Sequence, residues 1–174
     1  MERYINDKNE FAPSNIVIDG ALVMNPTEEQ LIAAGYHKYV APEKTLDDYK
    51  NDKTHEIMSY DSSSSVNSIT VKYGNDEFSY WLNMAQRSKL RVSAQTMKDL
   101  GYKTYRLDIR EKGISIDADI DTLITSINKM EEYATLCYRA TTDNLNAVKV
   151  LTTIDEVNNY DYKTGYPTKL IVEL

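Results

Sequence analysis

The sequence predicts an α+β protein: a small N-terminal β-hairpin module, followed by a helical body with two β-hairpins packed on a long C-terminal helix. Two observations lead to this prediction. Short apolar runs flank Asp19-Gly20, a pair that is favoured in two-residue hairpin turns. Apolar residues also follow helical spacing from Asp117 to about Leu151.

The chain has 174 residues, which is enough for one main core plus a small appended module, because domains commonly contain ~100–200 residues. A charged connector with little apolar surface begins at Pro42. We therefore place a boundary there, between an N-terminal β-rich accessory module at residues 1–42 and a main α+β domain at residues 43–174.

In the accessory module, we expect the first strand of the hairpin to pair with residues 3–5. A helix should follow, with Asn25 as its cap, proline in the first helical position and Glu28 completing a capping box. Gly35 is positioned to end that helix. Residues 36–40 can then return as an extended segment.

The main domain should open with a helix capped by Thr45 and reaching about residue 60, with a modest, interrupted apolar face. We expect most of this helix to be solvated. The serine run at residues 62–65 should end it, because serine hydroxyls compete for backbone hydrogen bonds.

A hairpin is predicted next, with strands at residues 66–73 and 77–81, anchored on the core by Trp81. Asn83 should cap a third helix that stops at Gly101. The core-facing positions predicted for this helix are Leu90, Ala94, Met97 and Leu100.

A second hairpin is predicted at residues 104–109 and 114–116, and the long helix starts at Asp117. At 1.5 Å per residue this helix would measure ~51 Å, against a diameter of ~40 Å for a compact globule of this length. Either it bends near Thr141 or the molecule is elongated. Its predicted core residues are Ile120, Leu123, Ile127, Met130, Ala134, Cys137, Thr141, Val148 and Leu151.

The C-terminal segment should contain a short helix that starts at Thr153, a loop at residues 160–167 and a closing strand at residues 169–174. The helix start has the pattern of a capping box. The closing strand is apolar enough to pair within a sheet.

Charge and hydropathy exclude several classes of partner. The chain has 20 basic and 27 acidic residues and a net charge of −7, without a basic stripe, so we expect no binding to nucleic acid or to an anionic membrane. No apolar run approaches the ~18 residues of a membrane span. The charged N-terminal segment leads us to expect that the chain folds in a cytoplasm.

Candidate catalytic and metal-binding residues are few. His37 and His55 are the two histidines, and neither has a nucleophile nearby in the sequence. His55-Glu56 matches the first two residues of the zinc-protease motif His-Glu-x-x-His. The second histidine of that motif would be at position 59, which is Ser59, so a zinc site is not predicted. The single Cys137 is flanked by apolar residues, which favours an inert, buried thiol.

Asp117, Asp119 and Asp121 match the opening of a calcium-binding loop. The glycine and the acid that such a loop requires later are replaced by Thr122 and Asn128, so we interpret the three acids as favourable charges at a helix N-terminus. The six glycines are too scattered to form a phosphate-binding loop. We therefore predict no catalytic residue, no metal, no cofactor and a non-enzymatic role.

Tyrosine is the outlier of the composition, with 14 residues. A tyrosine ring is apolar but its hydroxyl is polar, so it suits half-buried surfaces and interfaces. Tyr160, Tyr162 and Tyr166 lie in one loop, which either packs inward to hold the last strand or presents a partner site. The candidate partner-binding residues are Tyr36, Tyr39, Tyr160, Tyr162 and Tyr166.

Several sequence segments together carry a family resemblance. They are residues 25–31 (NPTEEQL), 33–36 (AAGY), 60–68 (YDSSSSVNS), 81–82 (WL), 132–134 (EYA), 137–138 (CY) and 161–167 (DYKTGYP), with Arg87. In combination they resemble an uncharacterised family from phages and prophages of gut Bacteroidetes, encoded near tail and tail-fibre genes. The resemblance implies a phage origin and a role in the virion or in its assembly.

The layout is also similar, more loosely, to tail-fibre assembly proteins of other tailed phages. We therefore expect a non-enzymatic tail-associated protein, either a structural adaptor or an assembly factor for the receptor-binding fibre. Its expected partners are other phage structural proteins, with a homo-oligomer left open. Its expected location is the virion tail, or the host bacterial cytoplasm during assembly.

Two alternatives remain open on the sequence. The first is a small phage enzyme that degrades cell wall or polysaccharide, which would need two carboxylates converging in a cleft. The second is a host-directed module that binds a bacterial protein through the loop at residues 160–166.

Overall fold

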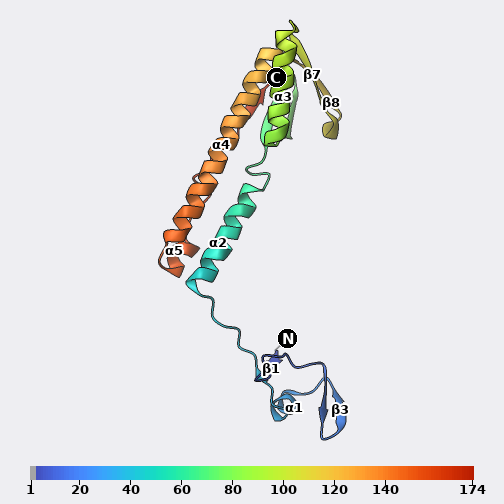
Figure 1. Cartoon of the computed structure of the whole chain (residues 1–174), viewed down its shortest axis with the longest axis vertical. Coiled ribbons are helices and arrows are strands. Elements are labelled where there is room, and N and C mark those ends of the chain that lie inside the picture. The colour runs from blue at the N-terminus through green and yellow to red at the C-terminus, as the bar shows by residue number, and fades with distance from the viewer. Residues whose placement is uncertain (1–2) are drawn as a thin grey trace. The chain divides into compact units, whose positions relative to one another are not determined.

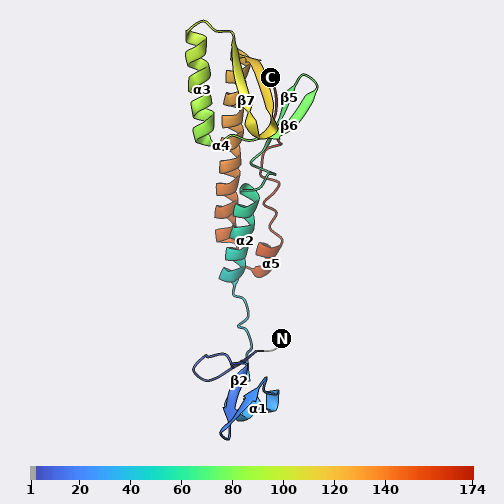
Figure 2. The same ribbon diagram turned by 90° about the vertical axis from the view of Figure 1, so that its right-hand side faces the viewer.

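A computed structural model describes residues 3–174, and the chain divides into two compact units, Met1–Lys44 (unit 1) and Thr45–Leu174 (unit 2). The division falls two residues after the boundary expected from the sequence. Helices and small sheets are mixed along the chain (Figures 1 and 2), which confirms the α+β class.

Unit 1 contains two small antiparallel sheets and one short helix. Strand β1 (Tyr4–Ile5) pairs with β4 (His37–Lys38), and β2 (Asn15–Ile18) pairs with β3 (Ala21–Met24). Helix α1 (Glu28–Ala33) lies between β3 and β4 in the sequence. The small core of the unit includes side chains from β1, β2 and α1.

The β2–β3 hairpin confirms the turn prediction. Ile18 pairs directly with Ala21, and the two turn residues Asp19 and Gly20 have φ angles of 50° and 81°. A type I′ turn requires positive φ at both of these positions.

The predicted pairing of the first hairpin strand with residues 3–5 is wrong. The Asn6 side chain accepts hydrogen bonds from the backbone of Lys8 and Glu10, which turns the chain sharply after β1. This turn brings Phe11, rather than β2, beside Ile5. Strand β1 therefore pairs with β4 and not with β2.

Helix α1 begins later than the sequence predicted. Thr27, not Asn25, is the cap: its hydroxyl accepts from the backbone N–H of Gln30, and the Gln30 side chain accepts from the N–H of Thr27. Asn25 instead adopts a left-handed conformation with φ 50°, directly after β3. The helix stops before Gly35, whose φ of 87° is favourable only for glycine, as expected.

Unit 2 is organised along helix α4 (Ile120–Val150), which continues through Thr141 without a break. Its 31 residues correspond to ~46 Å. Helices α2 (Leu46–Asp61) and α3 (Met84–Asp99) lie beside different halves of α4 (Figure 1).

Both shorter helices run antiparallel to α4, as four contacts show. In α2, Lys50 donates to the carbonyl of Lys149, and Asp61 accepts from Thr141. In α3, Arg87 meets Glu131 and Lys98 meets Asp121. Rising numbers in α2 and α3 therefore correspond to falling numbers in α4.

Two sheets lie near the α3 end of α4 (Figure 2). The first has the order β6-β5-β9, in which β5 (Ile69–Tyr73) pairs antiparallel with β6 (Asp76–Tyr80) and parallel with β9 (Ile171–Glu173). The predicted C-terminal strand thus pairs in a sheet, at its edge. Trp81 follows β6 and packs edge-on against Tyr133 of α4, with ring centroids 6.3 Å apart.

The second sheet is the hairpin of β7 (Thr104–Ile109) and β8 (Ile114–Asp119), joined by the 3-10 turn η1 (Arg110–Lys112). Strand β8 extends three residues beyond the predicted end, so α4 starts at Ile120. Asp117 is therefore a strand residue and not a helix N-terminal charge, because it pairs with Arg106 of β7.

The helix starts of unit 2 follow the sequence closely. Thr45, Asn83 and Thr153 cap α2, α3 and α5 (Ile154–Asn158), and each forms a reciprocal capping box with the third residue of its helix. Asp119 caps α4 by accepting from the N–H of Thr122 at 2.9 Å. These bonds use backbone N–H groups that the helix itself cannot pair.

The predicted core is largely confirmed, with corrections in α3 and α4. Leu100, expected to face the core, is 69% exposed. It is the C-cap of α3, where the chain leaves the helix. Ala134 and Leu151 are half-buried. The buried residues of α4 that the spacing did not predict are Ser126, Tyr133, Ala140 and Asn144.

Candidate functional site

In unit 2, the structure brings together the two tyrosine-bearing segments of the sequence, residues 60–68 and 160–167. The Tyr60 ring, in the last turn of α2, meets the rings of Tyr162 and Tyr166 edge-on, at centroid distances of 5.7 and 5.1 Å. All three rings are half-buried. Edge-to-face contacts of this kind stabilise an aromatic cluster beyond simple area burial.

A chain of hydrogen bonds lies beside these rings. The Thr141 hydroxyl is 2.6 Å from Asp61 Oδ1 and 2.7 Å from the Tyr166 hydroxyl. The Thr141 hydroxyl has a single proton, and it is directed to Asp61 and to the Cys137 carbonyl, which lies 3.1 Å away. Tyr166 must then donate to Thr141. We call this arrangement the Asp61–Thr141–Tyr166 chain; it links α2, α4 and the C-terminal loop.

Asn144 of α4 holds the other end of the loop. Its amide nitrogen donates to the carbonyl of Tyr162 at 2.9 Å, and its amide oxygen accepts from the Tyr160 hydroxyl at 2.8 Å. Asn144 is buried, and both functions of its side chain are satisfied. The hydroxyls of Tyr160 and Tyr166 are thus used within unit 2, which favours the packed interpretation of this loop.

A shallow hollow opens beside the tyrosine cluster. Two lysines flank the Tyr162 ring, with Lys53 Nζ at 5.8 Å and Lys163 Nζ at 5.9 Å from its centroid. Lys53 also forms an ion pair with Glu56 at 2.8 Å. The residues that line the hollow are Asp52, His55, Glu56, Ser59, Tyr60, Tyr162 and Lys163.

Burial raises the pKa of two further groups of α4 above their ordinary values. Burial raises the pKa of the Cys137 thiol, which is only 4% exposed. Burial likewise raises the pKa of Tyr133 to about 12, and its hydroxyl donates to the carbonyl of Val66 at 3.2 Å. A thiol with a raised pKa is a weak nucleophile, so Cys137 fits a packing role.

Residues 3–174 contain no group of three or more His, Cys, Asp or Glu side chains placed to hold a metal ion.

Over the same residues, no helix combines the length and the apolar character of a membrane span.

Unit 1 carries a different surface, on its β2–β3 hairpin. One face of the hairpin turns Ile16 and Val23 toward the small core. The opposite face carries three large apolar side chains with high exposure, Val17 at 67%, Leu22 at 66% and Met24 at 69%. We call these three residues the outer face of the hairpin.

The two tyrosine candidates in unit 1 lie apart from that outer face. Tyr36 is half-buried and packs on the small core. Tyr39 follows β4, and its ring meets Phe11 edge-on at a centroid distance of 5.3 Å. The tyrosine candidates therefore fall into two groups, one in each unit.

The outer face was not identified from the sequence, although a signal was present. A hairpin with one solvated face should alternate apolar and polar residues. Residues 16–18 and 21–24 are instead continuous apolar runs. In an isolated two-stranded sheet with one covered face, such runs leave apolar side chains on the other.

In comparisons with known proteins, no protein-family model, curated protein or solved structure matches the chain.

Proposed function

We propose that this protein is a non-enzymatic, protein-binding component of a bacteriophage tail. In this role it acts either as a structural adaptor in the virion or as an assembly factor for the receptor-binding fibre. Its partners are other tail or fibre proteins.

The outer face of the hairpin is the observation that carries the binding role. Val17 and Leu22 are directly opposite each other on neighbouring strands, and Met24 follows on the same face. Scattered apolar side chains are common on protein surfaces, but a cluster on one face is typical of an interaction site. Asp19 is the single charged residue between Asn15 and Met24, so little charge opposes an apolar partner.

The tail assignment is supported by the sequence resemblance described above. The same resemblance includes segments 60–68 and 161–167, which meet in the tyrosine cluster of unit 2. A contact of this kind gives the two segments a shared packing role. The binding role is therefore assigned to unit 1.

Mass spectrometry of purified virions separates the two forms of the proposal. A structural adaptor should be present in stoichiometric amounts relative to the tail proteins. An assembly factor should be absent from the virion but should copurify with the fibre during infection. A chain that is absent from virions and from fibre complexes alike would contradict the proposal.

Substitution of the outer face tests the binding role directly. Leu22→Lys places a charge on an exposed apolar position and should abolish copurification with the tail or fibre partner. Val92→Lys is a matched control, because Val92 of α3 is 66% exposed in unit 2. Equal partner retention by both variants would contradict the assignment to the hairpin.

A further inference from the structure

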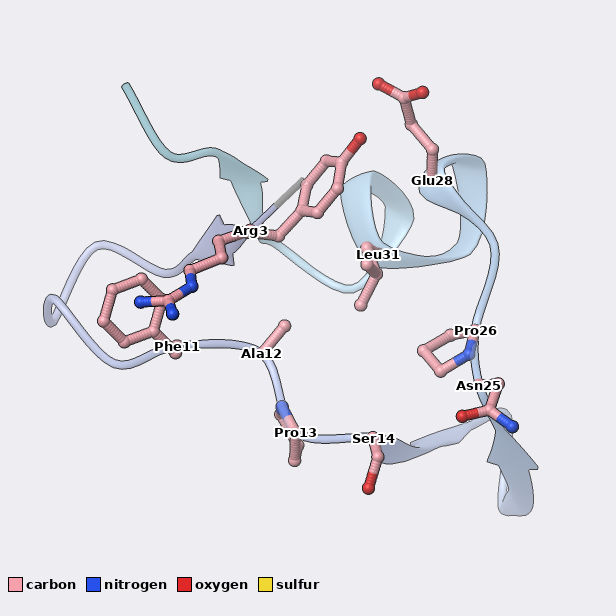
Figure 3. Close-up of a pocket in the computed structure, with 10 residues that line it drawn as sticks. Arg3, Phe11, Ala12, Pro13, Ser14, Asn25, Pro26, Glu28 and Leu31 are labelled. Carbon is pink, nitrogen blue, oxygen red and sulfur yellow. The ribbon is translucent and has the colours of Figure 1, made fainter. Parts of the chain in front are cut away.

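Unit 1 contains a hollow whose lining residues are separate from the outer face of the hairpin. It has a volume of about 740 Å³, within the ~300–1,000 Å³ range that is usual for ligand sites. Its walls come from the segment that precedes β2 and from the segment that leads into α1 (Figure 3). Apolar residues form much of its lining: Tyr4, Phe11, Ala12, Pro13, Pro26 and Leu31.

Two charged side chains of opposite sign also line the hollow, Arg3 beside Phe11 and Glu28 at the start of α1 (Figure 3). Within residues 3–174, no carboxylate forms an ion pair with Arg3, and no cation pairs with Glu28. Both charges are therefore available to an outside molecule, as far as the described residues go.

The Arg3 guanidinium lies over an aromatic ring. Its guanidinium carbon lies 5.5 Å from the centroid of the Phe11 ring. That ring is itself braced edge-on by Tyr39. A guanidinium offers a planar pair of N–H donors that match the two oxygens of a carboxylate.

We infer that this hollow binds an apolar segment of a partner protein that carries an acidic side chain, with the acid paired to Arg3. The inference rests on the proposed function, of which it names the partner chemistry. The apolar lining accommodates apolar side chains of the segment. Glu28 favours a basic or amide-bearing residue where the segment approaches α1.

A peptide selection on the full-length chain tests this inference. The probe is a pool of terminally blocked heptapeptides with two fixed leucines and random residues elsewhere. We expect Asp and Glu to be enriched about twofold to fivefold at one position, which is the range of an exposed ion pair. Arg3→Gln should abolish this enrichment. Lys8→Gln, a matched loss of an exposed charge in the same unit, should preserve it.

The Glu28 side of the hollow provides a second, independent readout. Glu28→Gln should weaken the preference for basic residues in the selected peptides, whereas Glu29→Gln, at the next position of α1 and outside the hollow lining, should not. Amide shifts in NMR spectra should map bound peptide to residues of the hollow. Unchanged acid enrichment in Arg3→Gln, or no peptide retention at all, would overturn the inference.

The other possible occupant is a second copy of this chain. Concentration-dependent self-association that Arg3→Gln removes would assign the hollow to that contact and overturn the inference. Failure of the proposed function can be told apart from failure of this inference. If the proposed function fails, the wild-type chain does not associate with tail proteins. Equal association of wild type and Arg3→Gln with those proteins would refute the inference alone.

Discussion

Units 1 and 2 differ most in how they treat their apolar side chains. The largest fully buried side chains all belong to unit 2, and most of them lie in a core that α4 shares with α3 and both sheets. The main buried cluster of unit 1 consists of Tyr4, Ile16 and Leu31. Unit 1 also exposes large apolar side chains on its hairpin.

This difference indicates which unit has more need of a partner for its stability. A unit as short as unit 1 buries a smaller fraction of its surface on folding than a larger domain does, and it has little stability to spare. A partner that covers the outer face or the hollow of unit 1 would add to its stability by mass action.

The largest effect should come from a cavity in the core of unit 2. Ile127 is 1% exposed, and Ile127→Ala should lower the free energy of unfolding of unit 2 by about 3–4 kcal/mol. Urea denaturation measures this loss.

Leu31→Ala in unit 1 should instead accelerate hydrogen exchange in α1 while leaving the exchange of α4 unchanged. If Ile127→Ala and Leu31→Ala lowered the stability of the whole chain equally, the two units would not differ in the way described here.

A buried cation is the next strongest feature of unit 2. Arg87 is 5% exposed, donates to Glu131 and to the carbonyl of Leu82 at 2.6 Å each, and lies over the Trp81 ring. Arg87→Met should cost about 2–3 kcal/mol, because it leaves a buried carbonyl without its donor. Arg91→Met, on the exposed part of the same helix, is the control and should change stability by less than about 0.5 kcal/mol.

Alkaline pH should destabilise unit 2. The pKa of Tyr133 is raised to about 12 in the folded state, against about 10 in an unfolded chain. Between these values the folded state retains a proton that the unfolded state has lost, so stability falls as pH rises, by up to about 2–3 kcal/mol. Burial raises the pKa of Tyr166 as well, which adds to the fall.

Denaturation curves at several pH values test this dependence. Tyr133→Phe should make the fall between about pH 10 and pH 12 shallower. Tyr138→Phe, on the exposed side of α4, should leave it unchanged. An identical alkaline profile for Tyr133→Phe and the wild type would refute the assignment to Tyr133.

A smaller effect is expected in the Asp61–Thr141–Tyr166 chain. Thr141→Val removes the donor to Asp61 and the acceptor for Tyr166, and should cost about 1–2 kcal/mol. Thr135→Val is the control, because Thr135 bonds only to the carbonyl of Glu131 on its own helix. Hydrogen exchange in the loop at residues 160–167 should increase in the Thr141 variant and not in the control.

The smallest effect should be confined to unit 1. Gly20 has a φ of 81° with open space around its Cα, so Gly20→Ala is opposed by backbone strain alone, of about 1 kcal/mol. Hydrogen exchange should increase in β2 and β3. Gly165→Ala is the control. Gly165 does not have a positive φ angle, and a methyl group added there would lie 3.7 Å from the Asn144 side chain, an ordinary van der Waals distance.

Local sequence signals located most elements of the fold. Cap residues at Thr45, Asn83 and Thr153 placed three helix starts, and Asp19-Gly20 placed the first hairpin. Such signals act over three or four residues, so no distant contact can easily override them. The start of α1 was misplaced where two cap candidates, Asn25 and Thr27, compete within three residues.

Of the candidate site, the sequence indicated the tyrosine loop but not the surfaces of unit 1. Tyr160, Tyr162 and Tyr166 were identified because they cluster within a few residues. Arg3 and Glu28 stand far apart in the chain and become neighbours of one hollow only when the unit folds. The same holds for Asp61 and Thr141.

The sequence by itself determined the order of elements, the α+β class and the main apolar face of α4, because each depends on the spacing of neighbouring residues. Tertiary structure decided the partner of β1, the burial of Arg87, Ser126 and Asn144, and the exposure of the hairpin's outer face. The physical reason is that pairing and burial depend on which surfaces meet, and hydrogen bonds formed across those contacts make buried polar groups stable.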